Sequence, residues 1–449
     1  MDNRLKFLCL TLGLWLACSV AMASAFEWQP GKGFRSAELT VPQIGRAGFS
    51  QLASVVTGIT FTNYLSRDRY TTNQIYLNGS GVTAGDVDGD GWCDLYFCGL
   101  DGSTVLYRNL GNWKFADITQ AAGVACANLD CSGAAFADID GDNDLDLLVN
   151  TIGAGTHCFL NDGRGNFTDI TASSGLASNH GSMSMALADI DGDGDLDLYV
   201  ANYRTMTVQD QPDIRLRGNY IDGKPVVISV DGRPTTQPDL VGRFTLNPNG
   251  KIIENGEVDV LYRNDGGGKF TPLLYTDGTF LDEDGKPLTA PLYDWGLSVM
   301  FRDINGDGVP DIYVCNDFRS PDRIWINDGK GRFRAISRLS FRTTSMFSMG
   351  IDFADLNRDG YDEIFVADML SRNHSRRHVQ VSDIMPTFLT IGQIEDRPQY
   401  PHNTLFLNRR DGTYAEVAQF SGVDASEWSW APIFLDVDLD GYEDLLITT

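Results

Sequence analysis

One short acidic motif recurs six times along the chain, and it limits the possible folds more than any other feature. Every copy has oxygen-bearing side chains at positions 1, 3, 5 and 9, Gly or Asn at position 6, and an apolar residue at position 12. Carboxylates this close repel one another, so a folded loop leaves them in solvent or holds a cation between them. The copies begin at Asp86, Asp138, Asp189, Asp303, Asp355 and Asp436.

Recurrence favours the cation, because a solvated acidic turn has no reason to repeat one ligand spacing six times. Hard oxygen ligands at these positions suit Ca²⁺, and a Gly or Asn at position 6 tolerates the positive φ of a tight ligand loop. An EF-hand would need Glu at position 12 followed by a helix. Here position 12 is apolar and lies in a strand-like run, as in LDLYVAN after Asp195. The sequence therefore predicts up to six calcium sites that are not EF-hands.

The candidate ligands are the residues at positions 1, 3, 5, 7 and 9 of each loop, with position 7 offering its backbone carbonyl. Loops with four side-chain carboxylates, those from Asp86, Asp138, Asp189 and Asp436, are expected to bind most strongly. The candidates are Asp86, Asp88, Asp90, Trp92 and Asp94; Asp138, Asp140, Asp142, Asp144 and Asp146; Asp189, Asp191, Asp193, Asp195 and Asp197; Asp303, Asn305, Asp307, Val309 and Asp311; Asp355, Asn357, Asp359, Tyr361 and Glu363; and Asp436, Asp438, Asp440, Tyr442 and Asp444.

Each loop lies inside a longer unit of four short strands, because apolar, β-branched runs alternate with turn residues. In the second unit these are 134–140, 146–152, 156–167, which includes a turn, and 167–171. Loop starts are 52, 51, 114, 52 and 81 residues apart, so the long intervals carry insertions. The pattern predicts an all-β β-propeller of four-stranded antiparallel blades, with five complete blades and a partial sixth. Residues 58–63 are expected to form a strand that closes the last blade.

These units resemble FG-GAP or VCBS repeats, the calcium-loop blades of integrin α-subunit heads, over residues 58–449. The phrases GITFTNYLSRDRYTTNQIYLNGSGV (58–82) and ASEWSWAPIFLDVDLDGYEDLLI (425–447) resemble the cartilage acidic protein or ASPIC/UnbV-type family more narrowly. The resemblance implies an exported protein with seven blades and a small C-terminal domain after the propeller. We therefore expect this chain to be truncated at its C-terminus.

The N-terminus has the basic start, apolar core and small-residue end of a secretory signal, predicted at 1–25 and followed by a leader at 26–57. A minor alternative is lipid attachment at Cys18. No other segment is apolar enough to span a membrane. The chain is expected to be secreted or held at the cell surface, in a bacterial periplasm or outside the cell. Among the cysteines, Cys126 and Cys131 are the one pair close enough in sequence to propose as a disulfide.

Charge and motifs narrow the function classes. The net charge of −26 argues against nucleic acid as a partner. We find no catalytic motif or cofactor-binding motif. The sequence favours a binding or adhesion module for extracellular protein or glycan, and an extracellular carbohydrate-active hydrolase or lyase is the alternative from another class.

Strand order predicts where a partner binds. In an up-and-down blade, the calcium loops join strands 1 and 2 at one end, whereas insertions 203–257, 275–294 and 369–402 leave from the other. We expect binding on that opposite face, where Arg372, Arg376 and Arg377, with His374 and His378, form a local basic cluster that suits an acidic glycan. The alternative is a solvated segment whose charges balance nearby aspartates. Aromatic and methionine residues before several first strands, such as Trp295 and Trp430, either line a ligand channel or pack the axis, and packing is favoured.

Overall fold

The computed structural model describes residues 29–32, 34–38, 48–101, 104–246, 251–318, 320–380 and 397–449. It contains two compact units, Met1–Gly48 and Phe49–Thr449. In the described part of the first unit, β1 (Gln29–Pro30) pairs antiparallel with β2 (Arg35–Ser36). The predicted signal segment, with Cys18, lies outside the described residues.

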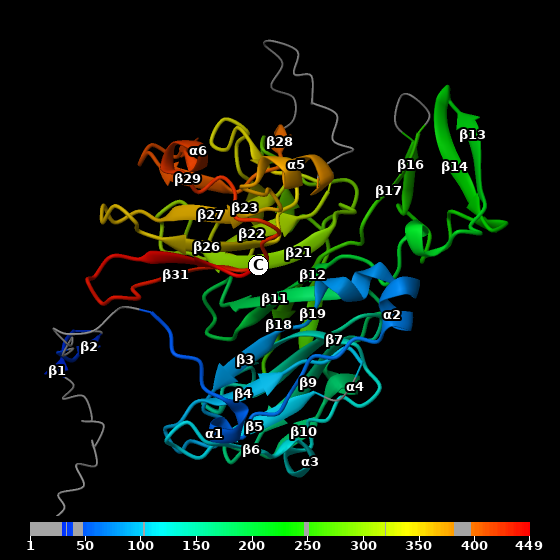
Figure 1. Ribbon diagram of the computed structural model, residues 1–449. Helices are drawn as coiled ribbons and strands as arrows, with labels where there is room; N and C mark the ends of the chain where they lie inside the picture. Colours follow the sequence, from blue (N-terminus) through cyan, green and yellow to red (C-terminus); the bar gives the residue numbers. More distant parts are fainter. Residues whose placement is uncertain are drawn as a thin grey trace, which may run out of the picture. The chain divides into compact units, whose positions relative to one another are not determined.

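The second unit is a series of antiparallel blades, as the sequence predicts (Figure 1). Five blades have four consecutive propeller strands, and the sixth has two. The first is β3 (Val82–Gly85), β4 (Asp94–Phe97), β5 (Val105–Asn109) and β6 (Phe115–Asp117); the second β7 (Cys131–Ala137), β8 (Asp146–Thr151), β9 (Gly155–Asn161) and β10 (Phe167–Asp169); the third β11 (Ser182–Ala188), β12 (Asp197–Asn202), β18 (Val260–Asn264) and β19 (Phe270–Leu273); the fourth β21 (Gly296–Arg302), β22 (Asp311–Asn316), β23 (Arg323–Asn327) and β24 (Phe333–Ala335); the fifth β26 (Gly350–Ala354), β27 (Glu363–Ala367), β29 (Thr404–Asn408) and β30 (Tyr414–Glu416); and the sixth β31 (Pro432–Leu435) and β32 (Asp444–Ile447).

The first strands of the blades lie side by side in chain order, β3, β7, β11, β21, β26 and β31. The hydrophobic core lies between the faces of neighbouring blades rather than in one central cluster. Tyr96 and Leu147 pack between the first and second blades, and Ile312 packs with Tyr199 between the third and fourth. Second strands such as β8 and β12 are buried along their whole length, because a blade covers them on each side. Short helices follow the fourth strands, α3 (Thr119–Ala122), α4 (Thr171–Ser174) and α6 (Ala418–Ser421).

The insertions add structure to this scaffold. The first holds η2 (Val208–Asp210), the sheet of β13 (Leu216–Ile221), β14 (Lys224–Val230) and β15 (Arg233–Pro234), and the pair β16 (Phe244–Leu246) and β17 (Ile252–Glu254). The second contributes β20 (Phe280–Leu281), which joins the fourth blade as an outer strand parallel to β24. In the third, α5 (His374–Gln380) precedes β28 (Gln399–Tyr400), which pairs parallel with β25 (Thr344–Ser345). Figure 1 shows the β31–β32 turn and β13–β17 at opposite sides of the unit.

The expected closing strand at 58–63 is wrong. After α1 (Ser54–Thr57) this segment is irregular and packs on the first blade, where the Thr60 amide donates to Tyr107 Oη at 3.0 Å. The ring of Phe61 also stacks on that of Phe97, with centroids 5.0 Å apart. These contacts partly cover the ring of Phe61, although the segment pairs with no strand in the described structure. The chain then passes through α2 (Arg67–Thr72) and η1 (Gln74–Asn78) into β3.

Candidate metal centres

The six acidic loops share one backbone conformation, which follows from their spacing. Position 6 has positive φ in every loop, including Asn143 at 71°, and position 9 begins the second strand. The position 1 carboxylate accepts amide hydrogens from within its own loop. In the third loop, Asp189 Oδ1 accepts from Gly192 at 2.7 Å and Oδ2 accepts from Gly194 at 3.0 Å. The loop is thereby wrapped around its first aspartate.

Position 9 joins its loop to the third strand of the blade, because its carboxylate accepts one backbone hydrogen bond from the loop and one from that strand. Asp197 Oδ2 accepts from the Ile190 amide at 2.9 Å, and Oδ1 accepts from the Asn264 amide at 2.8 Å. Burial raises the pKa of Asp197 to about 6 despite these donors, and it does the same at Asp146. Burial raises the pKa of Asp311 further, to about 7. The protein therefore compensates the negative charge of the position 9 carboxylate only poorly in each of these loops.

Four loops gather three carboxylates whose oxygens lie within 4.8 Å of one another. These are the four loops with a complete set of side-chain carboxylates. The groups are Asp86, Asp88 and Asp90; Asp138, Asp140 and Asp146; Asp189, Asp191 and Asp197; and Asp436, Asp438 and Asp444. Among the described residues, the loops from Asp303 and Asp355 form no such group, because an asparagine replaces the central carboxylate.

Position 3 shows that the donor set fits a divalent cation. The Oδ1 atoms of Asp88, Asp140 and Asp191 are buried without a hydrogen-bond partner. Burial, and then the neighbouring charge of Asp193, raises the pKa of Asp191. A buried, unpaired carboxylate oxygen beside two other carboxylates is costly unless a cation completes its coordination.

In the loop from Asp355, which has asparagine at position 3, other protein groups pair with the polar side chains. In the fifth loop, Asn357 Nδ2 donates to Glu363 Oε1 at 3.1 Å, and Arg410 Nη2 lies 2.5 Å from Asp359 Oδ2. An arginine also enters the first loop, where Arg108 Nε lies 2.5 Å from Asp88 Oδ2. At position 7, the side chains of Trp92, Tyr361 and Tyr442 are exposed. Side-chain chemistry therefore favours a cation most in the second and third loops.

A residue that we did not predict ties each of the first three loops to the next blade. The asparagine at the end of the third strand donates through Nδ2 to the position 2 carbonyl of the preceding blade's loop. Asn161 donates to Val87 O, Asn264 to Ile139 O and Asn327 to Ile190 O, each at 2.8 Å. The signal available in the sequence is the Asn that opens each strand 3 to 4 turn, as in NDGRGNF and NDGKGRF.

This clamp predicts a difference between two asparagines at the same position of their blades, Asn264, which is buried, and Asn109, which is partly exposed. Asn264→Ala should lower the free energy of unfolding by about 2 kcal/mol, because Ile139 O and other buried groups lose their partners. Asn109 makes the corresponding bonds inside the first blade, accepting from Gly111 N and donating to Cys93 O at 2.9 Å. It has no inter-blade bond in the described structure, so Asn109→Ala should lower the free energy of unfolding by clearly less than Asn264→Ala does. Denaturant titrations of both variants measure this, and equal losses would show that the inter-blade bond contributes nothing.

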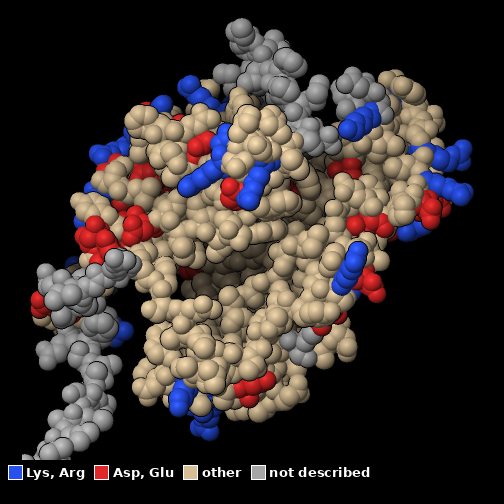
Figure 2. All heavy atoms as spheres, in the orientation of Figure 1, with Lys and Arg blue, Asp and Glu red and all other residues tan. Residues whose placement is uncertain are grey.

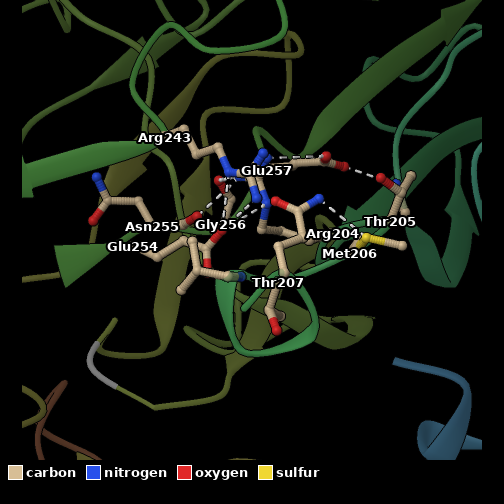
Figure 3. Close-up of polar contacts among 12 residues, drawn as sticks. Arg204, Thr205, Met206, Thr207, Arg243, Glu254, Asn255, Gly256 and Glu257 are labelled. Carbon is tan, nitrogen blue, oxygen red and sulfur yellow. Dashed lines mark hydrogen bonds and ion pairs between the residues drawn. The ribbon is translucent and has the colours of Figure 1, made fainter. Parts of the chain in front are cut away.

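The root of the first insertion is a buried ionic cluster on the opposite side of the blades (Figure 3). Arg204, whose side chain is 7% exposed, donates through Nη1 to the carbonyls of Asn255 and Gly256 at 3.0 and 3.1 Å. Its guanidinium also lies 3.7 Å from Glu254 and 3.8 Å from Glu257. Glu254 pairs with Arg243 at 2.8 Å. The cluster fixes both ends of the insertion against the third blade.

The predicted basic cluster is only partly available for a ligand. Arg372 Nε donates to Ala425 O at 2.7 Å and Arg377 Nε to Ser371 O at 2.5 Å, so both guanidinium groups hold the loop. Arg376 is 69% exposed and lies 3.5 Å from Glu427. On α5, the Nε2 atoms of His374 and His378 are 3.2 Å apart. Figure 2 shows basic side chains over the region of α5.

The cysteines of the described chain are unpaired. The predicted Cys126–Cys131 disulfide is therefore not formed, although both side chains are buried in the core cluster between the first and second blades. The axial residues Met183, Trp295 and Met349 are buried together in one cluster, as packing predicts. Trp428 is half-exposed instead and lines a cavity.

Comparison with known proteins agrees with this geometry. A model of the FG-GAP-like repeat matches residues 86–149, 151–200, 251–314 and 303–366, which together make up half of the chain. Each matched range contains one or two of the acidic loops. The chain belongs to the FG-GAP repeat family.

Curated relatives of this FG-GAP repeat chain include cartilage acidic protein 1. The Xenopus tropicalis protein is 27% identical over 331 residues, covering 68% of this chain and 50% of the relative. The Mus musculus protein is 27% identical over 339 residues, covering 70% of this chain and 52% of the relative. The chain therefore spans about half the length of these relatives.

Two solved structures are similar at low scores. A lectin of Agrocybe aegerita, described for recognition of non-reducing terminal N-acetylglucosamine, has a TM-score of 0.32 at 16% identity and covers 82% of this chain and 84% of its own. The V. cholerae biofilm matrix protein Bap1 has a TM-score of 0.33 at 14% identity and covers 74% and 38%. Neither likeness bears on function.

Proposed function

We propose that this chain is an exported, calcium-stabilised β-propeller that binds an extracellular acidic glycan through the face opposite its calcium loops. The observation that supports this most is the distribution of insertions. Strand connections on the metal side are short, whereas the two longest insertions join second and third strands and leave from the other end of the blades. Loops carried on a rigid scaffold are where binding residues concentrate.

Export rests on the predicted signal at 1–25 and on relatives named for cartilage. None of the helices in the described ranges has both the length and the apolar character needed to cross a membrane. Calcium is the cation proposed for the carboxylate groups, held by positions 1, 3, 5 and 9 and by the position 7 carbonyl. When bound, it would neutralise the loops and stiffen the turns that the asparagine clamps join to the next blade.

Arg376 offers the sharpest test of glycan binding, because its guanidinium is the most exposed of the basic cluster. Arg376→Gln should weaken retention of the calcium-loaded chain on sulfated or carboxylated glycans by roughly threefold to tenfold, since one rim charge is lost. Glycan-array and calorimetric titrations at two salt concentrations measure it.

The matched control for this test is Arg164→Gln. Arg164 is also an exposed arginine, but it lies in a strand 3 to 4 turn on the metal side. This variant should bind like the parent chain. Equal weakening by both variants would mean that overall charge, not the insertion face, attracts the glycan. No retention on any acidic glycan would reject the proposed ligand.

A further inference from the structure

An aromatic cavity lies among the first insertion, η1 and the inner ends of the third to sixth blades. Its volume is about 470 Å³. Figure 2 shows the surface of this unit hollowed near its centre. Five aromatic side chains line the cavity from four separate segments of the chain. They are Tyr203, Trp295, Phe318, Trp428 and Trp430.

Three of these rings pack against one another at steep angles. Tyr203 and Trp295 have centroids 4.7 Å apart and planes inclined at 64°, and Trp295 and Phe318 are 5.7 Å apart at 74°. The faces of aromatic rings carry negative electrostatic potential, so a lining rich in aromatic side chains favours a cation that is weakly hydrated.

The lining of the cavity also contains a buried carboxylate. Asp317 lines the cavity with 6% of its surface exposed. Its Oδ2 accepts from Tyr203 Oη at 2.9 Å and its Oδ1 from the Phe318 amide at 2.8 Å. Within the described residues no lysine or arginine forms an ion pair with it. Burial raises the pKa of Asp317 to about 7, because the charged carboxylate is removed from water.

The other charges of the lining do not supply this missing cation. Glu254 lines the same cavity but is paired with Arg243 at the root of the insertion. Lys251 also lines the cavity and is engaged in a contact of its own. Among the described residues, Asp317 is therefore the carboxylate of the lining that forms no ion pair with a lysine or arginine.

The turn that carries these groups is strained. Phe318 has φ of 59°, a conformation that bulky side chains rarely adopt. Gln399, from the third insertion, holds the turn by donating Nε2 to Phe318 O at 3.1 Å and to Ser320 O at 3.0 Å. Such strain persists where the surrounding structure enforces it, and it concentrates at ligand sites. Here it brings the Phe318 ring and the Asp317 carboxylate to one cavity.

We propose that this cavity binds a small organic ammonium ion, with its cationic group against Asp317 and the rings of Tyr203, Trp295 and Phe318. Such an ion combines the two properties that the lining selects, a positive charge and an apolar surface that is weakly hydrated. The inference does not rest on the proposed glycan role, because the cavity is a separate site from the exposed arginine of α5.

Choline and its uncharged carbon isostere, 3,3-dimethylbutan-1-ol, test the proposal because they share a shape and differ in charge. Choline should bind the calcium-loaded chain at least about tenfold more tightly than the alcohol. Calorimetry and quenching of tryptophan fluorescence measure both ligands, since three tryptophans line the cavity. Equal affinities, or no choline binding at millimolar concentrations, would overturn the inference.

Asp317→Asn removes the charge and keeps an acceptor for Tyr203, so it should cost choline roughly tenfold in affinity and leave the alcohol unchanged. Asp322→Asn is the matched control. Asp322 is equally buried and accepts from Tyr313 Oη at 2.9 Å and the Asn316 amide at 3.0 Å, but it does not line the cavity. Unchanged choline binding in Asp317→Asn, or an equal loss in Asp322→Asn, would contradict the assignment. Glycan retention by Asp317→Asn reports separately on the proposed function.

Discussion

Removing calcium should lower the thermal unfolding midpoint of this chain by roughly 5 to 10 °C. Extracellular calcium sites bind with dissociation constants of about 10⁻⁴ to 10⁻³ M, so millimolar calcium stabilises each filled loop by about 1 kcal/mol. Four loops gather three carboxylates each, and their contributions add if the loops are independent. Differential scanning calorimetry in calcium and in chelator measures the shift.

The loops should also differ from one another in a way that tests the geometry. Asp191→Ala should destabilise the calcium-loaded chain more than Asn357→Ala. Asp191 belongs to a carboxylate group and has a buried oxygen without a partner, whereas Asn357 is satisfied within its loop by Glu363.

In chelator, Asp191→Ala should no longer lower the unfolding temperature of the chain. Without a cation, the substitution removes repulsion with Asp189 and Asp197, so the variant should unfold at the same temperature as the parent or above it. A variant that is equally destabilised with and without calcium would show that Asp191 is structural. If chelator left the melting curve unchanged, the loops would be solvated acidic turns that bind no stabilising calcium.

Loss of Arg204 should be the most damaging single substitution at the insertion root. Arg204→Ala leaves Glu257 buried without its cation and frees the carbonyls of Asn255 and Gly256, which costs about 3 to 5 kcal/mol. Burial lowers the pKa of Arg204, so the guanidinium bears a desolvation penalty that only its partners offset. Denaturant unfolding, with hydrogen exchange over residues 204–257, measures the loss and shows whether the insertion opens first.

Arg233→Ala is the control on the same insertion. Arg233 pairs with Asp239 at 2.7 Å, but both side chains are about half exposed, so solvent and salt screen the interaction. Its removal should have no measurable effect on the unfolding midpoint. If Arg204→Ala were equally silent, the buried cluster would not hold the insertion in place.

The structure bears on how the two ends of the propeller depend on each other. The asparagine clamps join the first three acidic loops to the following blades, and the blades carry the insertions from their other ends. A loop that loses its cation therefore loosens a contact between blades. We expect calcium to affect ligand binding through the rigidity of this scaffold, without direct contact between metal and ligand.

The acidic loops and the strand that follows each loop were predictable from the sequence, because each depends on residues within about fifteen positions of one another. The spacing of Asp189, Asp191 and Asp197 determined which carboxylates meet, and Asn143 adopts the positive φ that its place in the loop requires. Runs of apolar and β-branched residues between turn residues likewise indicated the strands, and strand order determined the end from which the insertions leave.

Tertiary structure alone decided the features that join distant residues. Segment 58–63 has a strand-like composition, yet Tyr107 and Phe97 hold it irregularly against the first blade. The bond from Asn264 to Ile139 O spans 125 positions, and Asp317 meets Tyr203 across 114. No local pattern encodes such pairs, because burial and hydrogen-bond partners are set by how neighbouring blades pack, and only the packed chain brings these atoms together.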